Sequence, residues 1–518
     1  MINSRTNNTI RNSLWGFINR FISLLVPFFI RTLIIYKLGA EFLGLSSLFT
    51  SIFTVLSLAE LGFGSAIVYS LYKPIYENDY STINSLLHYY KKVYRIVSIV
   101  ILIMGLILIP FIPKLIKGSY PDGINLMLVY LIFLLNTVVS YGFYAYKNSL
   151  LIAHHRIDII NRSNVLINLF MYICQIIILL SSSNFYLYAL SIPFFRVSLN
   201  LINARYAKKM YPNSIALGNI SKDMKDKLNK SVLGLFSIKV ASVTRNSIDS
   251  IAISSYIGLY AVAVYNNYYY IISAITGILL VITSSIAAGV GNSLVSETTD
   301  KNFSDLLKFN FIYMWITGIC TTLLATLYQP FMELWVGKDM LLPDSIMLLF
   351  VFYFLILKLG DIQAQYFDAA GLWWHGKWRG VIETVANVLL NLILGYFFGI
   401  VGILLATIFT VLFINFAYST YLLSKYLFKN KVAEYIRNQI RFLLVISFTT
   451  LLIYLLMYFI RVSTDTPKHL ILSMFFRFIL SFSLSNLIFF TVFFRTKQFN
   501  ISKKWVKHVI SNIIRKNL

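Results

Sequence analysis

The segment that decides the fold reads SLWGFINRFISLLVPFFIRTLIIY and covers residues 13–36. It is apolar over a length that can cross a bilayer, yet Arg20 and Arg31 interrupt it. A charge at bilayer depth costs roughly 2.5–3.5 kcal/mol on insertion scales. Such charges are usually kept where they face a water-filled cavity, a partner or a substrate. Both arginines are therefore candidate functional residues.

The rest of the chain repeats this apolar pattern. Hydrophobic residues make up 58% of the 518 residues and charged residues only 13%, whereas a soluble protein is about 25% charged. Apolar runs long enough to cross the hydrocarbon core recur along the whole length. The sequence therefore predicts an all-α polytopic membrane protein.

Fourteen segments are candidate transmembrane helices. They cover residues 13–36, 43–71, 94–113, 124–146, 163–183, 185–204, 232–256, 260–290, 309–330, 344–370, 381–399, 401–423, 442–460 and 469–494. With the N-terminus placed in the cytoplasm, the cytoplasmic segments hold 32 lysines and arginines and the outside segments hold 6. This bias follows the positive-inside rule, so we expect about 14 spans with both termini inside.

The net charge of +25 does not indicate nucleic-acid binding. Most of the bases lie between hydrophobic runs, where they set the orientation of the spans. Cys174 and Cys320 fall inside apolar runs and imply neither a disulfide framework nor a metal site. The N-terminus lacks a short apolar region with a small-residue cleavage site, so we expect no cleaved signal peptide.

A weak internal repeat predicts two lobes. A shift of 219 residues places Arg20 on Lys239 and Gly39 on Gly258; a chance match is the alternative. Six helices separate the copies, so the repeats would be parallel, with a site at their interface. The predicted parts are a lobe over 1–204, a basic cytoplasmic linker over 205–231, a second lobe over 232–424, two extra helices within 425–494 and a basic tail over 495–518. The basic linker either sets orientation alone or also contacts anionic lipid headgroups.

Arg20 and Arg31 lie eleven residues apart, which places them about 20° apart on one helix face. A polar face along a spanning helix is typical of a cavity lining. The alternative is that the two side chains extend to the inner and outer headgroup regions.

A second cluster of charges, Lys239, Arg245 and Asp249, lies in the predicted span 232–256. The i, i+4 spacing of Arg245 and Asp249 allows an ion pair on one helix face, which is the structural alternative to a role in binding. Lys239 has no acid one turn away on its own helix, so it needs a substrate, water or a group on another helix.

Other charges also fall inside predicted spans. Glu60 precedes a run of small residues that allows close helix approach, and it could answer Arg20 or Arg31 or titrate during transport. Lys358 and Asp361 are spaced i, i+3 and could pair with each other. Interhelical clamps are the expected role of two further arginines, Arg196 and Arg477.

Signals of catalysis are missing from the sequence. It contains no Walker loop, no His-Glu-x-x-His motif and no Cys-x-x-Cys motif. We therefore expect a transporter with no ATPase activity, no metal and no cofactor, and not an enzyme.

Three stretches resemble the Wzx-type polysaccharide flippases of the multidrug/oligosaccharidyl-lipid/polysaccharide exporter superfamily. They are NSLWGFINR (12–20), YKLGAEFLGL (36–45) and SLAELGFGSA (57–66). The resemblance implies two six-helix parallel-repeat lobes, often followed by two extra helices. It also implies a multi-pass protein of the bacterial inner (plasma) membrane.

The substrate that the resemblance implies is an oligosaccharide on undecaprenyl diphosphate. Such flippases are thought to turn it from the cytoplasmic to the outer leaflet by alternating access, for capsule or O-antigen assembly. Bilayer lipids and the polysaccharide polymerase machinery are further implied partners. Arg20 and Lys239 are then predicted to engage the pyrophosphate or acidic sugars, Arg31 and Arg245 to line the route, and Glu60 and Asp249 to serve as coupling acids.

Two alternatives belong to other classes. A membrane polysaccharide polymerase usually needs a large outside loop, and the predicted outside loops are short. A multidrug exporter of the same superfamily would carry organic cations and is expected to hold an excess of buried acids. Here the buried bases outnumber the acids: Arg20, Arg31, Arg196, Lys239, Arg245, Lys358 and Arg477 against Glu60, Asp249, Asp361 and Glu383. This excess favours an anionic cargo.

Overall fold

The computed structural model describes residues 2–60, 62–429, 431–460 and 466–517. In these ranges every regular element is a helix and none is a strand, so the all-α prediction is confirmed. Ten helices in the described ranges are long and apolar enough to cross a membrane, or up to eleven if a bent pair is counted as one span. Each of the fourteen predicted ranges overlaps one or more helices of the structure.

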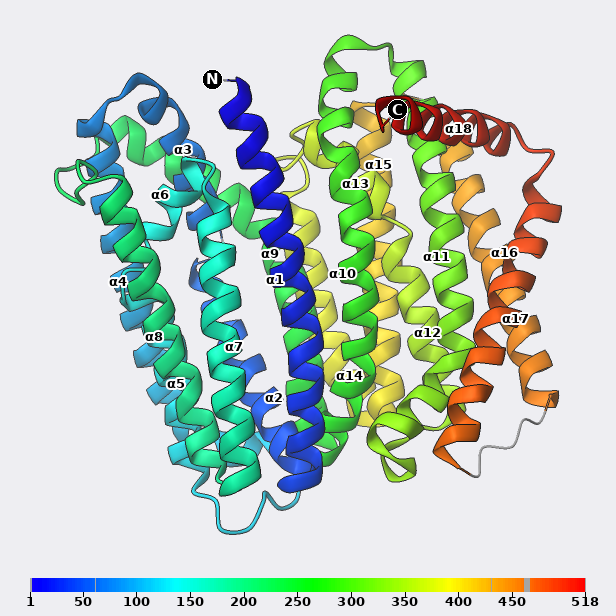
Figure 1. Ribbon diagram of the computed structural model, residues 1–518, viewed down its shortest axis with the longest axis horizontal. Helices are drawn as coiled ribbons and strands as arrows, with labels where there is room; N and C mark the ends of the chain where they lie inside the picture. The colour runs from blue at the N-terminus through cyan, green and yellow to red at the C-terminus, as the bar shows by residue number, and fades with distance from the viewer. Residues whose placement is uncertain (1, 61, 430, 461–465, 518) are drawn as a thin grey trace. The chain divides into compact units, whose positions relative to one another are not determined.

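The chain divides into two compact units, which are coloured from blue to green and from green to red in Figure 1. The first unit covers Met1–Asn266. Its elements are α1 (Ile2–Lys37), α2 (Ala40–Leu56), the 3-10 turn η1 (Ser57–Glu60), α3 (Phe63–Glu77), α4 (Tyr80–Leu108), the 3-10 segment η2 (Ile109–Leu115), α5 (Leu126–Gly142), α6 (Lys147–Ala153), α7 (Ile157–Ser181), α8 (Phe185–Met210), α9 (Lys222–Tyr256) and the start of α10 (Leu259–Ser296).

The second unit covers Asn267–Leu518. It contains the rest of α10, α11 (Thr299–Val336), the 3-10 turn η3 (Lys338–Met340), α12 (Asp344–Lys358), α13 (Asp361–Ala369), α14 (Lys377–Phe409), the π-helical segment η4 (Thr410–Phe416), α15 (Ala417–Tyr426), α16 (Val432–Phe459), α17 (Pro467–Phe493) and α18 (Lys497–Asn517).

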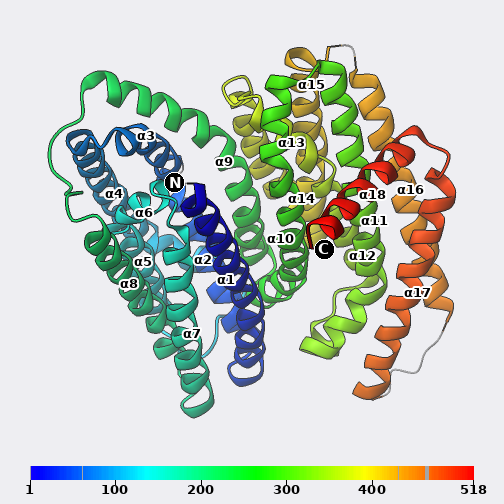
Figure 2. The same ribbon diagram turned by 45° about the horizontal axis from the view of Figure 1, so that its top comes forward.

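Helix α9 belongs to the first unit because it packs against α2, α3 and η2 (Figure 2). The backbone N–H of Lys117 also donates a hydrogen bond of 2.9 Å to the carbonyl of Ser254, near the end of α9. The predicted lobe boundary lies before this helix, at the linker 205–231. The lobe boundary that the sequence repeat indicates remains a prediction, because units defined by their internal contacts need not coincide with sequence repeats.

Helix starts follow directly from the sequence. Several helices begin after a short polar side chain that accepts a hydrogen bond from the backbone N–H three residues on, which satisfies one of the free amides of the first turn. These N-caps are Asp79, Asn125, Asn184, Ser221, Thr298 and Thr466.

The predicted span 43–71 is divided in the structure. Helix α2 ends at Leu56, η1 follows, and α3 begins at Phe63. Gly62 lies between them with φ 97° and ψ −30°, a conformation that other residues rarely adopt. This break turns the chain at Glu60, and it builds the site described below.

Helix α14 has a second break. Its 33 residues would extend about 50 Å as one straight helix, more than the hydrocarbon core. Gly399 has φ 57° and ψ −133°, and a Cβ added to Gly402 would lie 1.9 Å from the carbonyl oxygen of Leu394. The chain therefore folds back at Gly399, where the prediction divides spans 381–399 and 401–423.

Candidate functional site

A polar cavity of about 320 Å³ lies inside the first unit, next to the break between α2 and α3. Elements distant in the sequence contribute to its wall, namely η1, α3, α4, α5, α6, α8 and α9. The polar side chains that line it are Glu60, Ser65, Tyr90, Tyr94, Ser140, Tyr141, Asn148, Ser149, Arg196, Asn200 and Lys239. Such a lining suits a hydrated, charged ligand better than an apolar one.

Glu60 is the acid of the cavity and is held by a chain of hydrogen bonds. The hydroxyl of Tyr94 donates to Glu60 Oε1 at 2.9 Å, and the hydroxyl of Tyr90 donates in turn to Tyr94. The backbone N–H of Gly64 also donates to this carboxylate. The Tyr94 hydroxyl and the Gly64 N–H thus fix the position of Glu60 at the end of η1, and Tyr90 supports Tyr94.

Lys239 reaches the same cavity from α9. Its Nζ donates a hydrogen bond of 3.1 Å to Ser65 Oγ, and its charge attracts the carboxylate of Glu60. Lys239 has no acid one turn away on its own helix, and the structure supplies a hydroxyl and an acid from other elements. Its charge is partly balanced by Glu60, without a direct ion pair between the two among the described contacts.

Arg196 of α8 is the second cation in the cavity wall. Its side chain remains exposed, and it lies close enough to Tyr141 and Tyr172 to interact with them electrostatically. From the sequence, an interhelical clamp is the expected role of Arg196. Depth along a helix was the available signal, and depth does not show whether a side chain faces a neighbour or a cavity.

The other predicted cations lie apart from this cavity wall. Arg20 is exposed on α1, and Arg31 is half-buried near Tyr188 of α8. Arg245 is half-buried on α9. The cavity therefore unites Lys239 with Glu60 and leaves out three of the four residues predicted to bind substrate.

Asp249 and the second-unit charges have well-defined surroundings. Asp249 is 2% exposed and accepts a hydrogen bond of 2.7 Å from the Tyr265 hydroxyl. Lys358 pairs with Asp361 at 2.9 Å, as their i, i+3 spacing allows, and the Tyr313 hydroxyl donates to the same carboxylate oxygen at 2.5 Å. These charges are engaged by the protein itself.

Elsewhere among these side chains, Glu383 is buried and accepts a hydrogen bond of 2.8 Å from Asn415. Arg477 donates to Ser473 Oγ at 3.2 Å on its own helix. Among the described residues no group of three or more His, Cys, Asp or Glu side chains could hold a metal ion.

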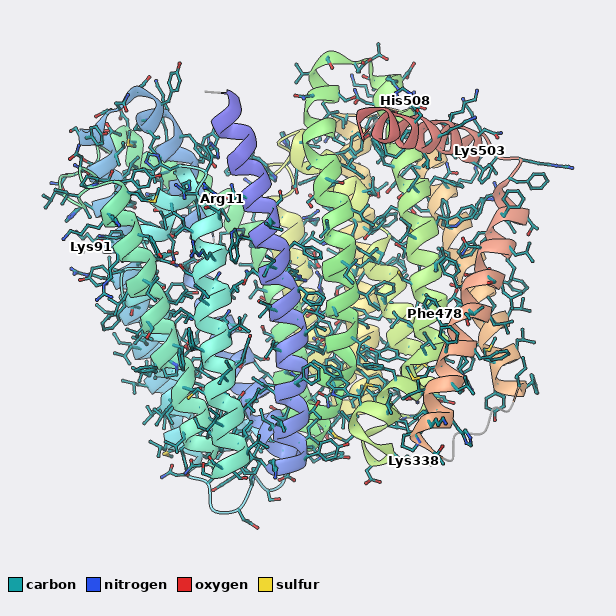
Figure 3. The ribbon with its side chains drawn as sticks, in the orientation of Figure 1. Arg11, Lys91, Lys338, Phe478, Lys503 and His508 are labelled. Carbon is teal, nitrogen blue, oxygen red and sulfur yellow. The ribbon has the colours of Figure 1, made fainter. Side chains whose placement is uncertain are left out.

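A cluster of charges ties α1 to the start of α7, outside the apolar part of these helices. Asp158 accepts from Arg11 Nε at 2.8 Å and from Arg156 Nε at 2.9 Å; Arg11 is labelled in Figure 3. Asn12 adds two hydrogen bonds, from its amide to the carbonyl of His155 at 3.0 Å and from the N–H of Asp158 to its oxygen at 2.7 Å. This arrangement fixes one end of α1 within the unit.

No protein-family model matches the sequence, and no curated protein matches it. Solved structures do. The chain superposes on the lipid II flippase MurJ in an inward closed conformation with a TM-score of 0.65 and 16% identity, over 94% of this chain and 100% of that one.

Two multidrug transporters are also similar. An inward-facing multidrug resistance MATE family transporter of the MOP superfamily gives a TM-score of 0.57 and 15% identity, over 76% of this chain and 93% of that one. The Vibrio cholerae MATE transporter VcmN gives 0.53 and 14%, over 82% and 99%. The chain therefore has the multi-pass helical fold that a lipid flippase and MATE transporters of the MOP superfamily share.

Proposed function

We propose that this protein is a flippase that moves undecaprenyl-diphosphate-linked oligosaccharide units from the cytoplasmic to the outer leaflet by alternating access, for the assembly of a cell-surface polysaccharide. The observation that carries the proposal is the polar cavity of the first unit, whose lining contains two cations, Lys239 and Arg196, and one acid, Glu60. Its fold, shared with a lipid II flippase, supports the same reading.

The chemistry of the proposal follows from the charge of the cargo. A pyrophosphate cannot cross hydrocarbon unaided because its desolvation is too costly. Arg and Lys replace its water with charge-assisted hydrogen bonds, which Arg can form in pairs. In this proposal Lys239 and Arg196 bind the pyrophosphate or an acidic sugar, and Arg20, Arg31 and Arg245 contribute along the route.

Glu60 has a defined part in the same scheme. Without cargo its carboxylate partly balances Lys239, and an incoming anion competes with it for that charge. Because Glu60 lies in the segment between α2 and α3, its release from Lys239 would transmit cargo binding to that segment. Asp249 is the second acid that we propose takes part in coupling. In that role its carboxylate would give up the hydrogen bond that it accepts from the Tyr265 hydroxyl.

The test is flipping of a fluorescent lipid-linked oligosaccharide in proteoliposomes. Lys239→Ala and Arg196→Ala are each expected to slow flipping at least tenfold, because each removes a charge-assisted contact of about 1.5–3 kcal/mol. Arg20→Ala and Arg20→Lys test whether Arg20 contributes along the route of the cargo. Lys92→Ala, at an exposed cation outside the cavity, is the matched control. Wild-type flipping by both cavity variants, with normal insertion, would falsify the proposal.

A multidrug exporter is the second candidate, because MATE transporters share the fold. The two candidate functions differ in the charge of the cargo, which is a cation for an exporter and an anion for a flippase. Uptake of a fluorescent organic cation into the same vesicles is expected to be absent. The exporter would be established instead by two results together: the protein transports the cation and Glu60→Gln abolishes this transport, and the protein does not flip the anionic lipid.

A further inference from the structure

The last helix, α18, is a feature that the transport site does not use. Residues 497–517 hold six bases, Lys497, Lys503, Lys504, Lys507, Arg515 and Lys516, and no acid. The helix packs on α11 and runs across the direction of the spanning helices of its unit (Figure 1). A basic helix with one apolar side, placed in this way, is typical of the membrane interface.

A groove of about 590 Å³ lies where α18 meets α11 and α17. Its volume is in the range of roughly 300–1,000 Å³ that small-molecule sites occupy. Its wall is apolar, with Ile312, Trp315 and Ile316 from α11, Phe490 from α17, and Phe499 and Val506 from α18. A groove of this composition suits a hydrocarbon chain.

Aromatic contacts join the three helices that form the groove. The ring of Phe499 lies 6.0 Å from that of Trp315 and 5.7 Å from that of Phe490, so one α18 side chain contacts both other helices. Six residues further along α18, Trp505 contacts Phe309, with ring centroids 5.6 Å apart. The groove is therefore formed by packing that already exists in the protein.

Two lysines stand at the rim of this apolar groove. Lys503 and Lys507 are spaced i, i+4 on α18, both line the groove, and both are exposed (Lys503 is labelled in Figure 3). Neither forms an ion pair with a described residue. The nearby acid of α11, Asp305, is already engaged by Lys301 and Lys308. Two positive charges beside a hydrocarbon-lined groove match an anionic lipid.

We propose that this groove binds one anionic glycerophospholipid of the cytoplasmic leaflet. An acyl chain lies against Trp315 and Phe490, and the headgroup phosphate accepts hydrogen bonds from Lys503 and Lys507. Basic residues at a membrane surface are attracted to anionic lipid headgroups. The bound lipid holds α18 against α11 and α17.

A resident phospholipid fits better than the transported lipid. The polar lining that a sugar chain needs is in the cavity of the first unit, whereas the groove has polar groups only at its lysine rim and Ser502. A lipid that stays bound to α18 is also compatible with a helix that remains on the cytoplasmic side of the membrane.

The experiment is native mass spectrometry of the full-length protein, titrated with phosphatidylglycerol, phosphatidylcholine of the same acyl chains, or undecaprenyl phosphate. We expect one phosphatidylglycerol to bind at least tenfold more tightly than phosphatidylcholine. The Lys503→Gln/Lys507→Gln variant is expected to lose this preference, by about tenfold or more, since two charges are removed. Lys504→Gln removes a charge on the same helix that does not line the groove and should bind as the wild type does.

A second variant, Ile312→Trp, fills the groove and leaves both lysines in place. It is expected to weaken binding of phosphatidylglycerol as strongly as the double lysine variant does. Equal binding of both phospholipids, equal loss in Lys504→Gln, or tighter binding of undecaprenyl phosphate at this groove would overturn the proposal. Flipping by the proteoliposome assay is a separate readout, so failure of one proposal leaves the other distinguishable.

Discussion

Two charge clusters, one in each unit, differ in how far the protein satisfies their charges. In the second unit, Lys358 is 4% exposed, and its partner Asp361 also accepts from Tyr313, so both charges are engaged by the protein. In the first unit, Lys239 donates to Ser65 and only partly balances Glu60, beside a polar cavity. A buried charge that the protein satisfies by itself is a structural element. A charge that faces a cavity, with its balance incomplete, is available to a ligand.

The largest expected effect on stability comes from breaking the ion pair between Lys358 and Asp361. Asp361→Ala leaves Lys358 buried without its acid. Breaking a fully buried ion pair costs about 3–5 kcal/mol, and the 32% exposure of the Asp361 side chain reduces that cost here. We expect a clear drop in the thermal unfolding temperature of the purified protein. Lys239→Ala should change that temperature by much less, which gives the direct contrast between the two units.

A paired substitution sharpens this result. Lys358→Met with Asp361→Leu removes both charges together and is expected to recover most of the lost stability, since apolar replacement of a whole buried pair is often neutral. A double variant as unstable as Asp361→Ala would show that the network with Tyr313, and not the buried charge, sets the cost.

The second effect is on the cavity and leaves the fold in place. A Cβ added to Gly64 would lie 3.0 Å from the Tyr90 hydroxyl and 3.2 Å from Glu60 Oε1. Gly64→Ala is therefore expected to displace Glu60 from Tyr94 and to change the flipping rate several-fold in proteoliposomes, with an unfolding temperature close to that of the wild type.

Gly291→Ala is the matched control, because nothing lies within 4 Å of a Cβ at that helical glycine. It should flip at the wild-type rate. If Gly64→Ala flips lipid at the wild-type rate, the position of Glu60 does not affect transport.

The smallest effect lies outside the spans, in the loop between α6 and α7. Burial, with a smaller contribution from His155, lowers the pKa of His154 to about 4, and its ring stacks on Tyr211 with centroids 3.8 Å apart. The unfolded chain has a histidine pKa near 6.5. Between these values the unfolded state binds the extra proton. This stabilising contribution is therefore complete above about pH 6.5 and is lost as the pH falls toward 4.

After allowance for partial exposure, the size of this contribution is about 1 kcal/mol. Unfolding temperatures measured from pH 7 to pH 4 should fall less in His154→Phe than in the wild type. His469→Gln, at an exposed position, is the control and should retain the full pH dependence. Equal slopes in His154→Phe and the wild type would contradict the assignment.

Local spacing made part of this structure predictable. The i, i+3 positions of Lys358 and Asp361 indicated their pair, and apolar runs located the helices. Lys239 and Glu60 could not be paired from the sequence, because 179 residues separate them and only tertiary packing brings α9 beside α3. The break at Gly62 was visible only as a cluster of small residues, which also fits close helix packing.

The break at Gly62 has a consequence for how the protein is made. Helix α2 has 17 residues, a length of about 25 Å, and α3 has 15, so neither is long enough alone to cross a hydrocarbon core of about 30 Å. During synthesis the translocon would have to accept residues 43–71 as one insertion unit, with Glu60 inside it. Lys239 is synthesised 179 residues later. The polar cavity is therefore incomplete until Lys239 has been synthesised, and until then Glu60 depends on local partners such as Tyr94.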